Sequence, residues 1–445
     1  MRFVWRAMPM ALCFVVSSMF VSNARAQTPT AAAAADDFAA QHDHMQMNMG
    51  QGWQLMQDGI VFAEFNHQGG PRGGNEFVVP NWWMGMATRS TSHGRLTFTS
   101  MLSLDAATVA KDGYRQIFQA GEALNGRPLI DRQHPHDLFM QLAVVWRTPV
   151  NDSTGFTLAG GPVGEPALGP VAFMHRASAA DNPTAPLGHH TFDSTHIAFG
   201  VVTAAVDHGP FVIEASLFNG REPDENRWDF DFGRLDSFSG RIWYRPNDEW
   251  EFQASSGRLV APEQLEPGNI IRSTASVSWT RKNGAAISSV TAAYGRNDTD
   301  HGARNALFVE GSRHVGLNTL YSRFEAVQTE TFVLATGLAP EQAAAGVTLP
   351  VVCPSVLHCV EPSSDRRDTV LAFTVGAVRD VVAWRGFQGG VGADLTFYGV
   401  PDALQPMYTA HPLSFHLFFR LRPPAGSMGR MWNMRMSQPM AGHGM

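Results

Sequence analysis

The sequence predicts an all-β fold, an antiparallel transmembrane β-barrel of about 12–16 strands. Segments of about ten residues alternate between apolar and polar side chains, as expected of strands with two different faces. Tight turns alternate with long loops between these segments, and no apolar run after residue 26 approaches the ~20 residues of a membrane-spanning helix. The 42 glycines, 27 prolines and 16% charged residues suit many short strands and long loops.

The alternation is clearest in the last predicted strand, within residues 411–423. One face is wholly apolar and carries Leu413, Phe415, Leu417, Phe419 and Leu421. The opposite face is mostly polar and carries Ser414, His416, Phe418, Arg420 and Arg422. Because successive side chains of a strand point to opposite faces, this segment predicts a strand between an apolar and a wet environment.

Other segments repeat the pattern. Phe238, Ile242 and Tyr244 alternate with serine and arginine, and Ile197, Phe199 and Val201 are expected on one apolar face. Lys282-Asn283-Gly284 predicts a hairpin between two alternating segments. Tryptophans near the predicted strand ends suit the aromatic girdles of a membrane barrel. They are Trp82, Trp83, Trp146, Trp243, Trp250, Trp279 and Trp384.

A soluble β-sandwich or propeller is the alternative to a membrane barrel, since its strands also alternate. No blade-length repeat is present, which counts against the propeller. The apolar faces contain little charge, and charge on a lipid face costs about 2–4 kcal/mol near the midplane, so a lipid exterior around a wet lumen is favoured. Five arginines are expected to line the lumen and set the field felt by small solutes. They are Arg132, Arg241, Arg245, Arg420 and Arg422.

The ends of the chain predict export. Residues 1–26 have a positive start, an apolar stretch and an Ala24-Arg25-Ala26 cleavage site, which together indicate a signal peptide. Cleavage there removes three arginines and no acid, so the formal charge moves from −7 to −10 and argues against nucleic acid as a partner. We expect a disordered Met/His-rich segment at 27–58, one barrel at 59–423 and a Met-rich tail at 424–445.

Both tails are candidate copper ligands. Neither has a core-forming period, and thioethers select Cu(I) while imidazole also accepts Cu(II). The N-terminal candidates are His42, His44, Met45, Met47 and Met49, and the C-terminal candidates are Met431, Met434 and Met436. Compositional drift in disordered tails is the alternative interpretation.

A second histidine cluster falls between predicted strands. His134-Pro135-His136-Asp137 holds two imidazoles and a carboxylate on a stiff extended turn, because Pro135 fixes its own φ and biases His134 to extended geometry. The next long loop adds His175, His189, His190 and His196. Two such loops folded into the lumen could assemble a zinc or copper site, although His189 and His190 would project to opposite sides of an extended chain. The alternative is an inward-folded plug whose polar groups only satisfy one another.

The spacing of two cysteines predicts a disulfide. Two cysteines remain after Ala26, and in an exported protein Cys353 and Cys359 predict a disulfide across one loop, with a metal clip including His358 as the alternative.

Neither a G-x-S-x-G elbow nor an H-E-x-x-H motif is present, so an enzyme is not expected.

Residues 113–146 (GYRQIFQAGEALNGRPLIDRQHPHDLFMQLAVVW) and 164–202 (GEPALGPVAFMHRASAADNPTAPLGHHTFDSTHIAFGVV) resemble a family of uncharacterised bacterial outer-membrane β-barrel proteins. The resemblance covers about residues 75–425. It implies envelope location and barrel architecture, and it transfers no catalytic residue. The Met/His-rich ends alone are similar to those of copper-resistance outer-membrane proteins.

Together these features predict a porin-like barrel in the bacterial outer membrane, in contact with lipid and the barrel insertion machinery, that handles copper or another metal ion. No cofactor is expected to be required, and copper or zinc is the candidate ion. One alternative is a structural or general-diffusion barrel with a His-rich plug and no metal role. The other is an outer-membrane hydrolase.

Overall fold

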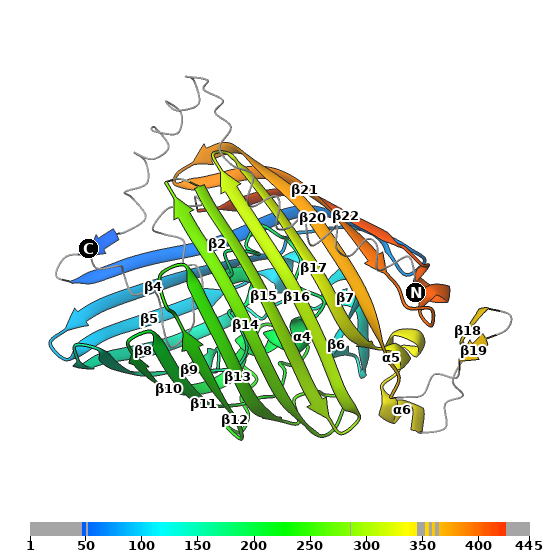
Figure 1. The fold of residues 1–445 in the computed structure, drawn as a ribbon, viewed down its shortest axis with the longest axis horizontal. Coiled ribbons are helices and arrows are strands. Elements are labelled where there is room, and N and C mark those ends of the chain that lie inside the picture. Colours follow the sequence, from blue (N-terminus) through cyan, green and yellow to red (C-terminus); the bar gives the residue numbers. More distant parts are fainter. Residues whose placement is uncertain are drawn as a thin grey trace.

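Sixteen antiparallel strands form a closed barrel (Figure 1). The computed structural model describes residues 47–49, 52–284, 286–344, 352–355, 358–360 and 365–423. The first barrel strand pairs with the second on one edge, where Trp53 faces Arg89, and with the last on the other edge, where Val61 faces Leu421. These pairings close the sheet and exclude both the sandwich and the propeller.

The barrel strands follow one another along the chain. They are β2 (Trp53–Gln68), β4 (Asn81–Thr91), β5 (Gly94–Leu102), β8 (Phe139–Asn151), β9 (Thr154–Gly164), β10 (Ala198–His208), β11 (Phe211–Phe218), β12 (Ser237–Tyr244), β13 (Trp250–Val260), β14 (Asn269–Asn283), β15 (Ala286–Thr299), β16 (Gly302–Val315), β17 (Asn318–Glu330), β20 (Arg367–Trp384), β21 (Phe387–Gly399) and β22 (Leu413–Arg422).

The remaining elements are short. The strands are β1 (Met47–Met49), β3 (Gly74–Val78), β6 (Tyr114–Leu124), β7 (Arg127–Gln133), β18 (Val352–Ser355) and β19 (His358–Val360). The helical segments are α3 (Asp105–Thr108), η2 (Phe173–His175), α4 (His189–Phe192), η3 (Ser194–His196), α5 (Thr331–Thr336), α6 (Pro340–Ala344) and α7 (Gln405–Tyr408). In the part of the chain that the structure describes, no helix is long and apolar enough to cross a membrane.

The two ends of the barrel differ in their connections. At the end that we call the turn rim, hairpins such as β14–β15 and β20–β21 join neighbouring strands, and the pairing of Asn283 with Ala286 confirms the hairpin predicted at Asn283-Gly284. The opposite loop rim carries most of the long connections, including residues 103–138 and 165–197. Since Trp53 pairs with Arg89 near the β4–β5 hairpin, β2 begins at the turn rim, and β22 ends there too.

The exterior of the wall is apolar, as the sequence predicts. On β22, Leu413, Leu417 and Phe419 are exposed, while His416 and Arg420 point into the lumen and are buried. Large exposed apolar side chains recur around the barrel, among them Val202, Ile213, Leu217, Phe238, Ile242, Leu320, Val391, Leu395 and Phe397. A closed barrel pairs all its strand edges, so an apolar exterior is the surface of a transmembrane barrel of the outer-membrane type.

Five residues assigned to the apolar exterior are buried instead. Ile197, Phe199 and Val201 are buried, and Val202 faces the exterior in their place. Of the predicted girdle, Trp82 and Trp243 are likewise buried inside. The reason is that the lumen is not wet along its whole height: the inner wall packs an apolar surface where loop segments fill it.

These loop segments, residues 103–138 and 165–197, form what we call the plug. In Figure 1 α4, β6 and β7 lie within the ring of strands. Nearly every side chain between residues 165 and 197 is buried. Phe173 and Met174 of the plug join Ile60 and Phe418 of the wall in one apolar cluster, and further clusters unite the plug with other strands. The plug therefore has a packed core with the wall.

Wall side chains also satisfy the backbone of the plug. A buried loop without a strand ladder leaves carbonyl groups that need donors. Arg241 donates to the carbonyl of Gly169 at 3.0 Å, and Arg272 donates to that of His190 at 2.6 Å. Other wall donors to plug carbonyls are Arg323 on Thr184, Ser312 on Ala177 and Asn297 on His190. The polar inner face of the barrel is therefore the anchor of the plug.

The structure differs from the predicted boundary between the N-terminal segment and the barrel. The barrel begins at Trp53 rather than residue 59, and Met47–Met49 pair with β2 as a short strand, so part of the segment predicted to be disordered is ordered. The barrel ends at Arg422, close to the predicted 423. The signal peptide and the tail after residue 423 lie outside the described residues.

The loop predicted to contain a disulfide forms two short strands. β18 and β19 carry Cys353 and Cys359 and pair antiparallel, with Val352 opposite Val360. The cysteine side chains lie outside the described part of the structure, so the disulfide stays a prediction.

Candidate metal centre

Five imidazoles gather inside the plug. His134 and His136 follow the β6–β7 hairpin, and His189, His190 and His196 come from α4 and η3. The ring centroids of His134 and His190 are 5.6 Å apart, and those of His189 and His190 are 5.4 Å apart. His196 continues the cluster at 5.3 Å from His189 and 5.8 Å from His136. The structure thus brings together histidines from two loops that are more than fifty residues apart in the sequence.

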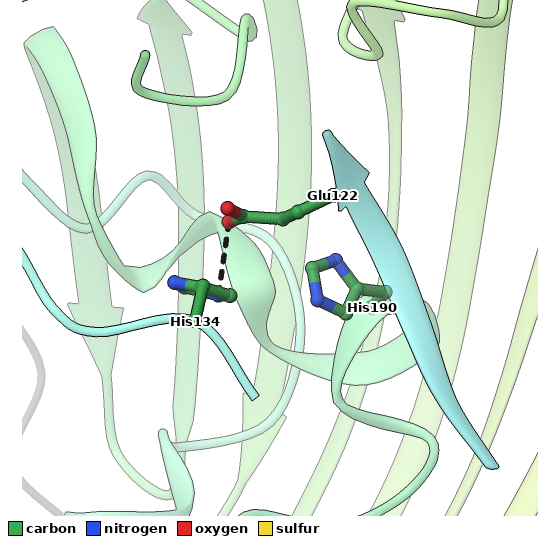
Figure 2. Close-up of side chains that lie close together, drawn as sticks. All are labelled: Glu122, His134 and His190. Carbon is green, nitrogen blue, oxygen red and sulfur yellow. Dashed lines mark ion pairs between the residues drawn. The ribbon is translucent and has the colours of Figure 1, made fainter. Parts of the chain in front are cut away.

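Glu122, His134 and His190 form the tightest group of ligand atoms in this cluster. One nitrogen or oxygen of each lies within 4.8 Å of the others. His134 Nε2 lies 2.9 Å from a Glu122 carboxylate oxygen. Figure 2 shows the three side chains converging from β6, from the segment after β7 and from α4. Two imidazoles and a carboxylate are a ligand set that suits zinc and copper.

Local sequence explains how the hairpin presents its ligands. Asn125 and Gly126 both have positive φ, 53° and 72°, as a two-residue turn of this hairpin type requires. The turn folds β6 onto β7, which places Glu122 on one strand and sends the chain through Pro135 into β8. Pro135 keeps the segment between the two histidines extended.

The prediction that His189 and His190 project to opposite sides is wrong. It assumed an extended chain, whereas both residues begin the helical turn α4. A helical turn separates neighbouring side chains by about 100° rather than 180°. His189 therefore lies beside His134 as well as beside His190, with the rings of His134 and His189 6.4 Å apart.

The protonation states favour metal binding. Burial lowers the pKa of His134 to about 4 and that of His190 to about 4, so both rings are neutral at neutral pH. Burial alone would raise the pKa of Glu122, but the interactions of its carboxylate with His134 and with the charge of Arg227 outweigh it and hold that pKa below its usual range. Arg227 Nη2 donates to Glu122 at 2.7 Å. A neutral imidazole and an ionised carboxylate are the forms that bind metal ions.

A small cavity of about 30 Å³ adjoins the group. Glu122, His134 and His196 line it together with Glu222 and Arg272. His190 Nδ1 lies 3.2 Å from Glu222 Oε1 across the same region. Such a volume exceeds the roughly 10–15 Å³ that one water needs, so it accommodates a single ion or water.

The other predicted metal ligands have different surroundings. His175 packs edge-on against Trp82, with ring centroids 4.9 Å apart, and belongs to the apolar contact between plug and wall. Asp137 lines the small cavity but accepts a hydrogen bond from Arg227 at 3.4 Å. His42, His44, Met45, Met431, Met434 and Met436 lie outside the described residues, and of Met47 and Met49 only the backbone is described.

The five predicted lumen arginines all lie inside, and each has at least one acidic partner. Arg241 pairs with Glu214 and Glu165, and Arg245 with Glu251. Arg420 binds Asp181 and Asp380, Arg422 approaches Asp181 at 2.9 Å, and Arg132 lies 3.2 Å from Glu76 and Asp112. The pairs with Glu165 and Asp181 attach plug segments to the wall.

Ser194 and His196 each form a hydrogen bond with another residue. Ser194 Oγ accepts a hydrogen bond from Arg272 at 2.9 Å. His196 Nδ1 lies 2.7 Å from the carbonyl oxygen of Asp193, to which it donates. Because each residue is held by another group, the hydrolase alternative gains no support from this pair.

Glu122 was not among the metal ligands predicted from the sequence. It lies twelve residues before His134, the nearest histidine in the sequence. The Asn125-Gly126 dipeptide was the available signal, because a two-residue hairpin turn brings residues on both of its sides together. Reading that turn would have placed Glu122 beside the segment that leads to His134.

The comparison with solved structures is the one that found similar proteins. No family model and no curated protein matches the chain. Among solved structures, OmpF of Salmonella typhi is 7% identical, with 84% of this chain and 100% of that chain covered and a TM-score of 0.49. The anion-selective porin from Comamonas acidovorans is 12% identical, covering 83% and 99%, with a TM-score of 0.45. OprB of Pseudomonas putida is 10% identical, covering 91% and 99%, with a TM-score of 0.48.

Proposed function

We propose that this protein is a porin-like outer-membrane barrel that binds a zinc or copper ion in its plug and takes part in handling that ion at the cell envelope. The observation that carries the proposal is the convergence of Glu122, His134 and His190 on one point. Three protein ligands leave the fourth position of a tetrahedral ion to water or to an incoming ligand. Such an incompletely coordinated ion exchanges more readily than one in a closed structural site.

The position of the site within the plug supports a role in the passage of the metal ion through the barrel rather than in its storage at the protein surface. Glu122 pairs with Arg227 and His190 with Glu222, and both partners belong to the loop-rim connection between β11 and β12. The site thus lies on the loop-rim side of the plug. The tails leave from Trp53 and Arg422 at the turn rim, and in outer-membrane barrels short turns face the periplasm. We infer that Met/His-rich tails on the periplasmic side take copper ions that the plug site has bound.

Zinc titration of the detergent-solubilised mature protein tests the binding step. His42, His44 and His443 are replaced by Gln in all samples, so that tail imidazoles do not contribute. Glu122→Gln should weaken zinc binding by about 10-fold or more, because it removes the only carboxylate from the ligand set. Glu341→Gln is the matched control, since Glu341 also pairs with a histidine, His301, at 2.9 Å. Equal affinity of both variants would reject the site.

A plug without a metal role is the second candidate, favoured by the 2.9 Å contact between His134 Nε2 and the Glu122 carboxylate, which gives each group a hydrogen-bonding partner. Single-channel conductance in planar bilayers separates the two. A metal-binding plug should conduct differently with and without micromolar zinc, and Glu122→Gln should abolish that difference. A zinc-independent conductance in the unmodified protein would favour the structural plug.

A further inference from the structure

Three further histidines, His136, His189 and His196, lie outside the Glu122 site, and each has its Nδ1 beside an oxygen acceptor. His136 Nδ1 lies 2.8 Å from Asp105 Oδ2, and His189 Nδ1 lies 2.7 Å from Asp193 Oδ1. His196 Nδ1 lies 2.7 Å from the Asp193 carbonyl oxygen. A carbonyl oxygen and an ionised carboxylate only accept hydrogen bonds, so Nδ1 donates a proton in each ring. This leaves Nε2 of each ring as the atom that can bind a metal ion.

Two of these lone pairs are buried and unused. Nε2 of His136 and Nε2 of His196 make no hydrogen bond to any residue that the structure describes. His136 is 9% exposed and His189 is 1% exposed. A buried acceptor without a partner is destabilising, and such atoms in native proteins call for a specific explanation, among which a bound ion is one.

Carboxylate partners on Nδ1 are the usual support of metal-binding histidines. They fix the tautomer, orient the ring and make Nε2 a stronger donor to the metal. Asp105 is itself held, because its other oxygen accepts the backbone N–H of Asn81 at 2.8 Å. Asp193 is held by Arg176 at 2.7 Å. Both orienting groups are thus anchored before any ion arrives.

The ring spacing matches shared coordination. With Zn–N distances of 2.0–2.1 Å and tetrahedral angles, two imidazoles on one ion have centroids about 5–5.5 Å apart. His189 and His196 are 5.3 Å apart, and His136 and His196 are 5.8 Å apart. The ligand nitrogens of the three rings do not all lie within 4.8 Å of one another, so the rings must move closer together when an ion binds. Two of the three ring spacings and the burial of the rings therefore favour shared coordination.

We propose that the plug binds a second zinc or copper ion through His136, His189 and His196, directly beside the Glu122–His134–His190 site. The second site is an all-imidazole set, whereas the first includes a carboxylate. The ring of His134 lies 6.3 Å from that of His136 and 6.4 Å from that of His189, so the two ligand sets are in contact. This inference rests on the proposed function and extends it to a two-ion centre.

Zinc stoichiometry tests the second site. The full mature chain, with His42, His44 and His443 replaced by Gln, is dialysed against buffered zinc and analysed for bound metal and protein. Variant A carries Glu122→Gln and His134→Gln, and variant B carries His136→Gln and His196→Gln. We expect two zinc ions in the parent, one in each variant and none when A and B are combined.

X-ray absorption at the zinc edge identifies which site remains. Variant A should show imidazole ligands from three histidines, and variant B should show two imidazoles with a carboxylate. One zinc in the parent together with one in variant B would overturn the second site and leave the proposed function intact. No zinc in any sample would overturn the proposed function itself. Loss of all zinc in variant A would show that the second site does not bind independently, which also overturns the inference.

A further measurement uses only the parent protein, so that misfolding of a plug variant cannot affect the result. The parent is loaded with one and then two equivalents of Cu(II) and studied by electron paramagnetic resonance. Two ions in adjacent sites should give a dipole-coupled pair at two equivalents that is absent at one. Two equivalents of uncoupled copper would overturn the adjacent sites.

Discussion

Two buried polar clusters lie side by side in the lumen and use their hydrogen-bonding atoms differently. In the arginine cluster, Arg176 binds Asp193 and Glu310 at 2.7 Å, and Arg323 binds Glu310 at 2.9 Å. Two positive and two negative charges thus compensate one another. In the histidine cluster the rings are oriented by Asp105 and Asp193, yet they keep lone pairs that nothing described in the structure uses.

The difference distinguishes a structural cluster from a binding cluster. Burial of charge is tolerated when every charge is paired, and Arg176, Glu310 and Arg323 meet that condition between plug and wall. A histidine ring that is held in one orientation while its lone pair has no partner adds no stability through that lone pair. A metal site needs such an oriented ring before the ion binds. Asp193 belongs to both clusters, so the structural cluster positions the binding cluster.

The largest expected effect comes from breaking the arginine cluster. Arg176→Leu leaves Asp193 and Glu310 without their main partner inside the barrel, and removal of one member of a buried ion pair costs about 3–5 kcal/mol. We expect the plug to undock while the wall stays folded. Hydrogen exchange of residues 165–197 and bilayer conductance should both increase.

Arg296 provides the control for that prediction. It pairs with Asp298, but both side chains are 44% exposed. Arg296→Ala should change neither exchange nor conductance, because exposed ion pairs contribute little. If Arg176→Leu behaved like Arg296→Ala, the arginine cluster would not be what holds the plug.

The next effect contrasts the plug with the wall. Leu417 is 53% exposed on the lipid side of β22, so Leu417→Arg places a charge in hydrocarbon and should cost about 2–4 kcal/mol near the membrane midplane. Leu413→Arg, on the same face at the first residue of β22, should cost less because charge near the interface is tolerated better. Denaturant titration of refolding in lipid vesicles measures both. Equal stability of Leu417→Arg and the parent would contradict a lipid-facing exterior.

The wall could be predicted from the sequence because its signal is local. On β22 each residue reports its own face by its polarity, and the hairpin at Asn283 needs only adjacent residues. The failures have a common cause. Phe199 has an apolar side chain on the inner face because a distant loop packs against it, and no local pattern reveals that loop.

The site could be predicted only in part for the same reason. The cluster of histidines in two loops pointed to His134 and His190, but their proximity depends on how the barrel closes around both loops. The residues around Glu122 in the sequence contain no histidine or other pattern that indicates a metal ligand. His175 has the same residue type as the ligands, and only its contact with Trp82 separates it from them.

The third effect tests orientation within the histidine cluster. Asp105→Asn removes the charge that holds His136 Nδ1–H but keeps an oxygen that can accept the N–H of Asn81. Loss of such a supporting carboxylate typically lowers metal affinity by about 10–100-fold. In zinc titrations the weaker binding should affect only the second site. The affinity of the Glu122 site serves as the internal control, and a parallel loss at both sites would indicate general damage to the plug.

The smallest effect is an expected absence of pH dependence. An ordinary imidazole with a pKa near 6.5 is about three-quarters protonated at pH 6, which lowers metal affinity by about fourfold for each ring. Burial lowers the pKa of His134 and His190 to about 4, so both rings remain neutral from pH 8 down to pH 6. Zinc affinity of variant B, measured by chelator competition, should stay constant over that range and fall only as the pH approaches 4. A loss of tenfold or more between pH 8 and pH 6 would mean that these rings titrate like exposed histidines, and the distinction between a preorganised binding cluster and a solvated one would fail.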